Sequence, residues 1–435
     1  MLPLPPIHQF TPERAYGNII EPRLVTKAGS KVSYLNPRFS GSDADLYMTS
    51  DEGNEYQRLV RVHLADGTAN VVNTEPWDVE SFAVSGDGKR IAYVTNENGI
   101  STLHVIDASG HAVVVPPMPK GLITDLQWRP DGHVIGFDLE TARAPLDVYS
   151  VDVEVHALMR WTESETGGLN AAQNAEPELV TLKSFDGTTI SAFVYRPDAA
   201  RHPGKRPVVL IIHGGPEDQS RPWFQNRLNY WINELGIALV YPNVRGSLGY
   251  GKTFLALDNK MKREDTIKDI GAILDWIGTD PRLDAGRIGV YGPSYGGYMT
   301  LATMTHYNDR IRAAIEAVGI SNFVTFLENT SGYRKDLRRV EYGDERIPAE
   351  REFLTRVSPL TSASKISKPL LVVAGDKDPR VPASEGRQIV KAVRANGGPV
   401  WWLLAKDEGH GFVKKPNRDF QTLAMTEFWQ EFLLK

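Results

Sequence analysis

The chain has 435 residues, of which 41% are hydrophobic and 24% charged, so it can build two globular domains, each with its own core. Its net charge of −5 is small and its basic residues are scattered, so we expect neither nucleic acid nor an anionic membrane as a partner. The absence of cysteine excludes disulfides, thiolate metal ligands and a cysteine nucleophile.

The first residues, "MLPLPPIHQF", do not have the charged and then apolar segments of a signal peptide. Apolar runs elsewhere fall short of the ~18 residues that a membrane-spanning helix needs. We therefore expect a cytoplasmic protein without membrane contact.

A weak repeat of short strands and turns runs through the first third of the chain. The segments "VSGDGKRIAYVTN" (84–96) and "QWRPDGHVIGFDL" (127–139) place Asp87 and Asp131, each followed by glycine, 44 residues apart. Further aspartates follow at a similar pitch: Asp66, Asp107 and Asp152. Alternating strands with turns every ~40 to 45 residues are typical of propeller blades. The alternative is a β-sandwich in which this spacing is coincidental.

Only about three such units fit between residues 30 and 165, whereas a closed propeller needs at least ~4 blades. We therefore predict a truncated, all-β, β-propeller-like domain over residues 1–165. Bare strand edges invite pairing. We expect the array either to pack against the second domain or to be covered by a partner chain, and the second case predicts a homodimer through the propeller edges.

A polar linker is predicted at 166–178, and strands alternate with helices from residue 179 to 435. This alternation predicts an α/β domain with a doubly wound, mostly parallel sheet. Two helices are expected to bury one apolar face each, with Ile267 to Ile277 on the first and Phe420, Leu423, Phe428 and Trp429 on the second. The runs that predict fully buried strands are 208–214, 237–244, 287–292, 313–320, 370–375 and 400–404.

Ser294 lies in "GPSYG", after a predicted strand and before a predicted helix. A G-x-S-x-G pattern in this context predicts a nucleophile elbow, in which flanking glycines permit a sharp turn that exposes the serine hydroxyl. The alternative is a structural glycine-rich turn. A nucleophilic serine predicts an α/β-hydrolase fold for this domain.

A serine nucleophile needs a base, and in this fold the acid and then the histidine follow it in the chain. Only His306 and His410 come after Ser294. His306 lies on the helix directly after the turn, too early to follow a strand that carries the acid. We therefore predict His410, in "DEGHGF", as the general base.

The acid is expected after the strand "LLVVAG", where the loop holds both Asp376 and Asp378. It must reach a ring nitrogen of the histidine to fix its tautomer. Spacing alone does not choose between the two aspartates, and the other one is expected to shape the loop.

Stabilisation of an oxyanion needs two convergent backbone donors. One is expected to be the N–H of Tyr295, which follows the nucleophile, and the other an N–H from the loop of Gly214 and Gly215 in "HGGP". His213 in the same loop is predicted to order the loop and not to act as a second base.

These motifs together resemble the prolyl oligopeptidase family of serine peptidases, closest to its acylaminoacyl-peptidase and dipeptidyl-peptidase-like bacterial members. The resemblance covers about residues 175 to 435, and its motifs are "HGGP" (213–216), "YPNVRGSLGYGKTF" (241–254), "GPSYGGYM" (292–299), "GDKDPRVP" (375–382) and "EGHGF" (408–412).

The resemblance implies roles for single residues. Its D-x-R-V-P pattern assigns the catalytic acid to Asp378 and places Arg380 near bound substrate, with a loop salt bridge as the alternative for the arginine. Its oxyanion donors correspond to the N–H groups of Gly215 and Tyr295. Relatives carry seven or eight blades that screen the site, whereas the region here is about half that length, and it shows no "EE" clamp for a free amino terminus.

The sequence therefore predicts a serine hydrolase with an acyl-enzyme mechanism, a peptidase for short or N-acylated peptides. A carboxylesterase for short-chain acyl esters is the alternative, and a non-catalytic binding protein or a dinucleotide-binding loop at "RGSLGYG" are remoter ones. No pattern predicts a metal or another cofactor. The substrate pocket is expected to involve Trp223, Phe224, Phe323 and Phe326, although aromatic residues at such spacing are more often core.

Overall fold

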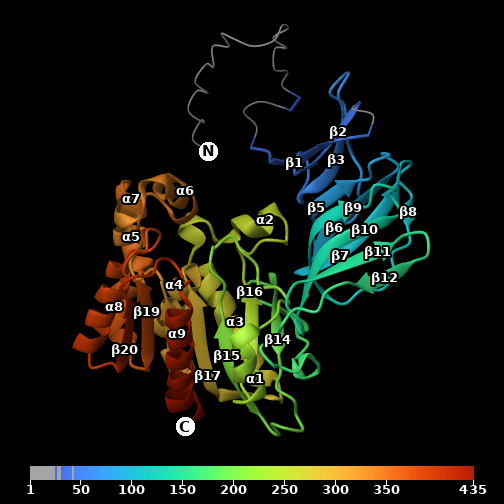
Figure 1. Ribbon diagram of the computed structural model, residues 1–435. Coiled ribbons are helices and arrows are strands. Elements are labelled where there is room, and N and C mark those ends of the chain that lie inside the picture. The colour runs from blue at the N-terminus through green and yellow to red at the C-terminus, as the bar shows by residue number, and fades with distance from the viewer. Residues whose placement is uncertain (1–24, 27–30, 42–43) are drawn as a thin grey trace.

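Two regions with different secondary structure follow one another in the computed structural model, which describes residues 25–26, 31–41 and 44–435 (Figure 1). The first is built from strands β1 to β12, and the last of these ends at Arg160. The second begins with a strand at Glu178 and alternates strands with helices. An all-β region followed by an α/β domain is the predicted fold class, which is confirmed. The linker bounds, 166 and 178, stay a prediction.

The strands of the first region are short and antiparallel. In the described residues they form three four-stranded sheets, β1–β4, β5–β8 and β9–β12. Side chains of β10 alternate between buried and half-buried positions, as expected for strands packed on one face. The strands are β1 (Tyr34–Phe39), β2 (Asp45–Ser50), β3 (Arg58–His63), β4 (Ala69–Val71), β5 (Asp78–Val84), β6 (Arg90–Glu97), β7 (Ile100–Asp107), β8 (Ala112–Val113), β9 (Gly121–Trp128), β10 (Val134–Thr141), β11 (Asp147–Asp152) and β12 (Ala157–Arg160).

The same Asp-Gly turn joins the first and second strands of two of these sheets. Asp87 and Asp131 each accept the backbone N–H two residues further on, at 3.0 Å. The glycine after each aspartate has a positive φ, 69° and 71° respectively, a conformation that glycine adopts without steric cost. The sequence repeat thus corresponds to a repeated four-stranded unit.

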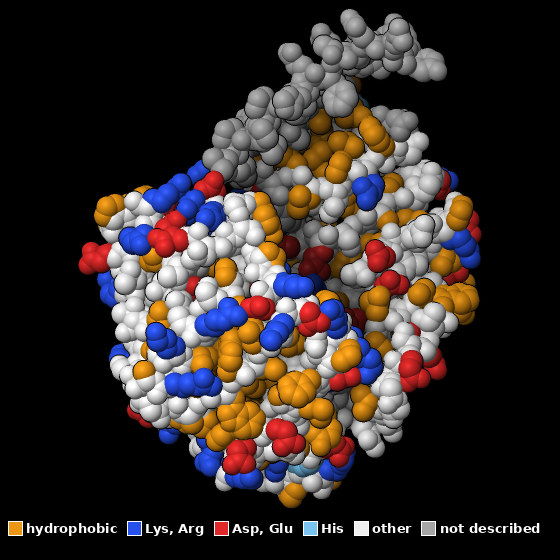
Figure 2. Space-filling model, turned by 60° about the vertical axis from the view of Figure 1, so that its left-hand side comes forward, with side chains coloured by type: hydrophobic (Ala, Val, Ile, Leu, Met, Phe, Trp, Pro, Cys, Tyr) orange, Lys and Arg blue, Asp and Glu red, His pale blue; other side chains and the backbone are white. Residues whose placement is uncertain are grey.

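The second four-stranded sheet packs against the α/β domain. The guanidinium of Arg221 donates to Glu80 Oε1 at 2.7 Å and to the carbonyl of Gly99 at 2.9 Å. Beside it, Asn96 Nδ2 donates to Gln219 Oε1 at 2.7 Å, and both side chains are buried. The open array therefore packs against the second domain, which is one of the two predicted ways of covering it. The surface is hollowed between the two regions (Figure 2).

The second region is organised around an eight-stranded sheet with the order β13-β14-β16-β15-β17-β18-β19-β20. Pairing is parallel from β16 to β20, and β13 and β14 are antiparallel. This is the predicted doubly wound, mostly parallel sheet. Its strands are β13 (Glu178–Lys183), β14 (Thr189–Tyr195), β15 (Arg206–Ile211), β16 (Ala238–Asn243), β17 (Leu283–Pro293), β18 (Ala313–Ala317), β19 (Leu370–Gly375) and β20 (Val400–Ala405).

Helices cover both faces of this sheet (Figure 1). They are α1 (Asn229–Asn233), α2 (Lys252–Leu255), α3 (Asp265–Thr279), α4 (Tyr295–His306), α5 (Phe323–Asn329), α6 (Gly332–Tyr342), α7 (Pro348–Val357), α8 (Ala383–Ala395) and α9 (Lys415–Trp429). Short 3-10 or π turns lie at η1 (Ala171–Gln173), η2 (Asn226–Leu228), η3 (Ala256–Asp258), η4 (Lys260–Lys262), η5 (Asn308–Arg310), η6 (Pro359–Lys365) and η7 (Gln430–Leu434). None of the helices that the structure describes is long and apolar enough to cross a bilayer.

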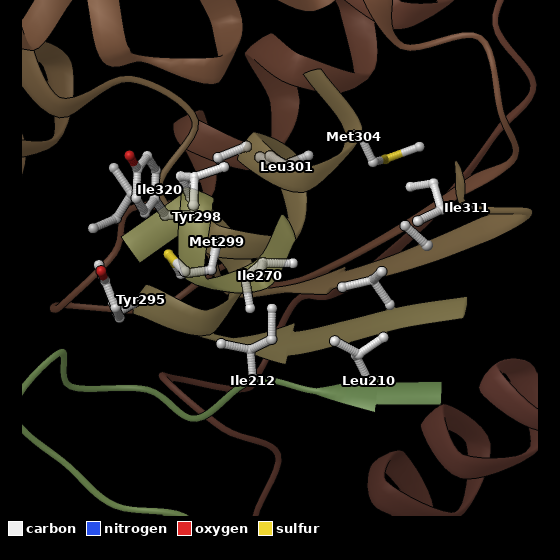
Figure 3. Packing of buried hydrophobic residues seen from close by; sticks show 14 of the residues in the cluster. Leu210, Ile212, Ile270, Tyr295, Tyr298, Met299, Leu301, Met304, Ile311 and Ile320 are labelled. Carbon is white, nitrogen blue, oxygen red and sulfur yellow. The ribbon is translucent and has the colours of Figure 1, made fainter. Parts of the chain in front are cut away.

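Separate apolar cores lie on the two faces of the sheet. On one face, Leu210 of β15 and Ile212, directly after that strand, pack with Ile270 of α3 and Met299 of α4 (Figure 3). On the other face, side chains of α1 and α9 pack against the sheet, among them Trp429. Burial of this much apolar surface fixes the strand ends that carry the site.

Two of the expectations about buried surfaces are wrong. In α9, Phe428 is fully buried, but Phe420 and Leu423 are 61% and 63% exposed, because only the C-terminal half of this helix packs on the sheet. β20 was expected to be fully buried, yet it is an edge strand, and Trp401 is 39% exposed.

Candidate active site

Ser294 forms the turn between β17 and α4, with φ of 58° and ψ of −121°. A Cβ on Gly292 would lie 2.2 Å from the carbonyl oxygen of Gly296, and a Cβ on Gly296 would lie 2.1 Å from the carbonyl oxygen of Ile212. Only glycine fits at either position. The serine is therefore held in the strained backbone conformation of a nucleophile elbow, at the N-terminus of α4.

The structure brings Ser294, His410 and Asp378 into one hydrogen-bonded chain. His410 Nε2 lies 2.9 Å from Ser294 Oγ, and His410 Nδ1 lies 2.7 Å from Asp378 Oδ2. Because a carboxylate only accepts, Nδ1–H donates to Asp378 and Nε2 is left to accept the serine proton. The Asp378 side chain is fully buried and that of His410 is 10% exposed.

The two aspartates left open by their spacing have different surroundings. The second oxygen of Asp378 accepts the N–H groups of Arg380 and Val381, at 2.8 and 3.0 Å. Asp376 instead forms a surface ion pair with Arg387, at 2.5 Å. Only Asp378 therefore reaches the imidazole.

The loop after β15 lies beside the serine. A Cβ on Gly214 would lie 3.5 Å from the Cβ of Ser294. Gly215, with φ of 110°, is joined to Pro216 by a cis peptide bond. The buried His213 donates from Nδ1 to the Gly214 carbonyl at 2.8 Å, so it orders the loop as predicted.

The backbone N–H of Tyr295 belongs to the first residue of α4 and therefore has no acceptor within the helix. The aligned peptide dipoles of α4 favour negative charge at this end. Gly215 and Tyr295, the predicted oxyanion donors, thus lie on the two chain segments that flank Ser294.

A buried ionic network lies behind Tyr295 and was not found in the sequence. The guanidinium of Arg263, 1% exposed, contacts the carboxylates of Asp258 and Glu341 and donates to Tyr295 Oη at 3.0 Å. Burial alone would lower the pKa of Arg263, but the ring of Tyr295 and the two carboxylates hold that pKa well above its ordinary value. The network fixes the residue after the nucleophile. Asp258 and Glu341 are 5 and 78 residues from Arg263, a separation that carries no local pattern.

The predicted pocket residues are not all at the site. Phe323 and Phe326 are 0% and 2% exposed and pack around Tyr342 in the core, which corrects the expectation that they line a pocket. Trp223 is half-buried and packs edge-on against Tyr241, with ring centroids 6.2 Å apart.

Two further predicted residues are placed at boundaries of the site. The N–H of Phe224 donates to Glu140 of β10 at 3.2 Å, so this residue lies where the two regions meet. Arg380 is exposed in the loop of Asp378. In the described residues it forms no salt bridge, contrary to the alternative considered for it. No group of three or more His, Asp or Glu side chains there could hold a metal ion.

Residues 222–435 match the sequence profile of the prolyl oligopeptidase family. The α/β domain of this chain belongs to that family. Among curated proteins, the chain is 32% identical over 408 residues to dipeptidyl aminopeptidase BIII from Pseudoxanthomonas mexicana, covering 86% of this chain and 55% of the relative. It is 26% identical to acylamino-acid-releasing enzyme 2 from Oryza sativa subsp. japonica, covering 69% and 42%.

Solved structures of the family share the fold of this chain. The structure of a puromycin-hydrolysing peptidase from Mycobacterium tuberculosis superposes with a TM-score of 0.83 at 25% identity, covering 95% of this chain and 64% of that one. Acylaminoacyl peptidase from Pyrococcus horikoshii gives a TM-score of 0.74 at 22% identity, covering 90% and 62%. The chain thus spans about two fifths to two thirds of the length of these relatives.

Proposed function

We propose that the protein is a serine peptidase that cleaves short or N-acylated peptides through an acyl-enzyme on Ser294. The observation that carries the proposal is the hydrogen-bonded chain from Ser294 Oγ through His410 to the buried Asp378, at 2.9 and 2.7 Å. A hydroxyl, an imidazole and a carboxylate in this order form the arrangement that activates serine in hydrolases.

The proposed mechanism follows from the position of each group. Ser294 Oγ attacks the scissile carbonyl while His410 Nε2 takes its proton, and Asp378 stabilises the imidazolium that forms. The N–H groups of Gly215 and Tyr295 donate to the oxyanion. His410 then protonates the leaving amine, and water activated by the same histidine releases the acyl group from the serine.

An acylated amino terminus is preferred over a free one in this proposal. A free terminus is a cation that needs carboxylates not already paired with another cation, and Glu80 is paired with the guanidinium of Arg221 at 2.7 Å. This pairing supports the acylaminoacyl mode over the dipeptidyl mode named for some relatives.

The test compares kcat/KM on three chromogenic substrates, of which two are p-nitroanilides and one is a p-nitrophenyl ester. N-acetyl-alanyl p-nitroanilide should be hydrolysed faster than alanyl-alanyl p-nitroanilide, and Ser294→Ala should abolish both activities. An enzyme that turns over p-nitrophenyl butyrate thousands-fold faster, with negligible anilide cleavage, would instead be a carboxylesterase.

We further propose that the protein forms a homodimer through the outer strands of its four-stranded sheets and acts in the cytoplasm. Exposed apolar side chains support the dimer: Phe39, on the first strand, and Trp161, after the last, are each 63% exposed. Light scattering that gives a monomer mass at micromolar concentration would refute the dimer.

A further inference from the structure

Helix α6 connects the two loops on which the proposed chemistry depends. At its start, Ser331 Oγ donates to the carbonyl of Pro379, next to Asp378, at 2.6 Å. Near its end, Arg338 Nη1 donates to the carbonyl of Gly215 at 3.2 Å. Side chains on the face of α6 between these anchors therefore lie beside the Asp378 loop and the oxyanion loop.

The cations on this helix differ in how they are neutralised. Arg339 is paired with the carboxylates of Asp336, Asp344 and Glu345. Arg334, in contrast, forms no ion pair in the part of the chain that the structure describes, and its Nε is buried without a hydrogen-bond partner.

Two further arginines lie close to Arg334. Arg338 follows it by four residues and so shares its face of the helix, and the nearest carboxylate to Arg338 is that of Glu217, at 3.8 Å. Arg380 belongs to the loop that anchors the start of the helix. Burial and then the positive charges of Arg338 and Arg380 lower the pKa of the Arg334 guanidinium, which nevertheless stays charged.

The neighbouring carboxylates do not offset this positive charge. Asp378 is engaged by His410, and Asp258 and Glu341 are engaged by Arg263 in the buried network. Glu217, whose side chain is 41% exposed, is the carboxylate left to face the arginines among the described residues. Partly buried guanidinium groups that lie close together destabilise the fold unless an anion binds to them.

We propose that Arg334, together with Arg338 and Arg380, binds a carboxylate of the peptide substrate beside the scissile bond. The inference rests on the proposed peptidase function and specifies its substrate class. Guanidinium groups bind carboxylates through paired, charge-assisted hydrogen bonds, and a half-buried site strengthens them. The carboxylate is either the free C-terminus of a short peptide or an acidic side chain.

The first experiment measures cleavage of matched N-acetylated peptides by chromatography. Acetyl-Ala-Ala with a free C-terminus is compared with its C-terminal amide, and acetyl-Ala-Glu amide with acetyl-Ala-Gln amide. We expect one of the two carboxylate peptides to have a kcat/KM about 10- to 100-fold above that of its neutral partner. This is the ratio that one hydrogen bond to a charged group produces. The pair that shows the preference identifies the source of the carboxylate.

Arg334→Gln should remove most of this ratio, while Lys335→Gln, which removes one charge from the next position of the same helix, should leave it unchanged. Addition of 0.5 M NaCl should also reduce the ratio, because salt screens a charge-charge contact. Equal ratios for wild type and Arg334→Gln, or no preference in either peptide pair, would overturn the inference.

A binding measurement separates this inference from the proposed function. Calorimetry on Ser294→Ala, which cannot form the acyl-enzyme, should show tighter binding of the preferred carboxylate peptide than of its neutral partner, and Arg334→Gln in that background should abolish the difference. If wild type cleaves no peptide, the peptidase proposal fails, yet the binding difference still decides whether Arg334 recognises a carboxylate.

Discussion

Glu316 provides a quantitative test of how the strand next to the nucleophile is buried. It lies on β18 beside β17, is 1% exposed, and accepts the N–H of Gly319 with one oxygen. Its other oxygen has no hydrogen-bond partner in the described structure. Burial, with a contribution from the charge of Glu385, raises its pKa from 4.5 to about 8.

The direction of the pH effect follows from this pKa. Because the folded state holds the proton more tightly than the unfolded state, Glu316 favours folding below pH 4.5 and loses this contribution as the pH rises toward 8. The loss is about 1.4 kcal/mol per pH unit within that window. Glu316→Gln removes the titration while keeping the size of the side chain and the acceptor for Gly319.

The assay is urea denaturation at pH 5.5 and 7.5, followed by tryptophan fluorescence. The free energy of unfolding of Glu316→Gln, relative to wild type, should increase by roughly 3 kcal/mol between the two pH values. Glu427→Gln, on the exposed face of α9, is the matched control and should show no such change. If Glu316→Gln and wild type have parallel pH dependences, Glu316 is not held protonated and the reasoning is refuted.

Three other substitutions test the site and its support. Asp378→Asn should lower kcat by about 10³- to 10⁴-fold with an unchanged circular dichroism spectrum, because the histidine tautomer is no longer fixed; a loss under 10-fold would exclude Asp378 as the acid. Gly296→Ala should destabilise the protein by at least about 2 kcal/mol in thermal unfolding, because its Cβ would lie 2.1 Å from the Ile212 carbonyl oxygen; an unchanged Tm would contradict this contact. Arg263→Met should cost about 3 to 5 kcal/mol in urea unfolding, since two carboxylates stay buried without their cation; a neutral effect would show that the network does not stabilise the fold.

The sequence predicts the elements whose signals are local. The apolar runs and the glycines around Ser294 fix the strand, the turn and the helix over a few residues, and the order of serine, acid and histidine limits the base to His410. The repeated Asp-Gly turns identify the sheet array for the same reason, because each turn depends only on its own residues.

Residues whose role depends on distant contacts could not be predicted. Asp376 and Asp378 share one loop, and their spacing does not choose between them; the resemblance to the family favours Asp378, and the folded chain shows its contact with the imidazole. Aromatic spacing did not separate core from pocket, so Phe323 was placed at the site although Tyr342, from another helix, covers it. Arg263 has no local signal, because Glu341 and Tyr295 come from distant segments and its five-residue spacing from Asp258 matches no recognised pattern.

Covalent labelling of the active serine tests the central claim most directly. A fluorophosphonate probe, which traps activated serine hydroxyls, should modify wild type stoichiometrically, and mass spectrometry of the digested protein should place the adduct on Ser294. His410→Ala should slow this labelling by several orders of magnitude. Modification of another residue at the same rate, or undiminished peptide cleavage after Ser294 is fully labelled, would contradict the account.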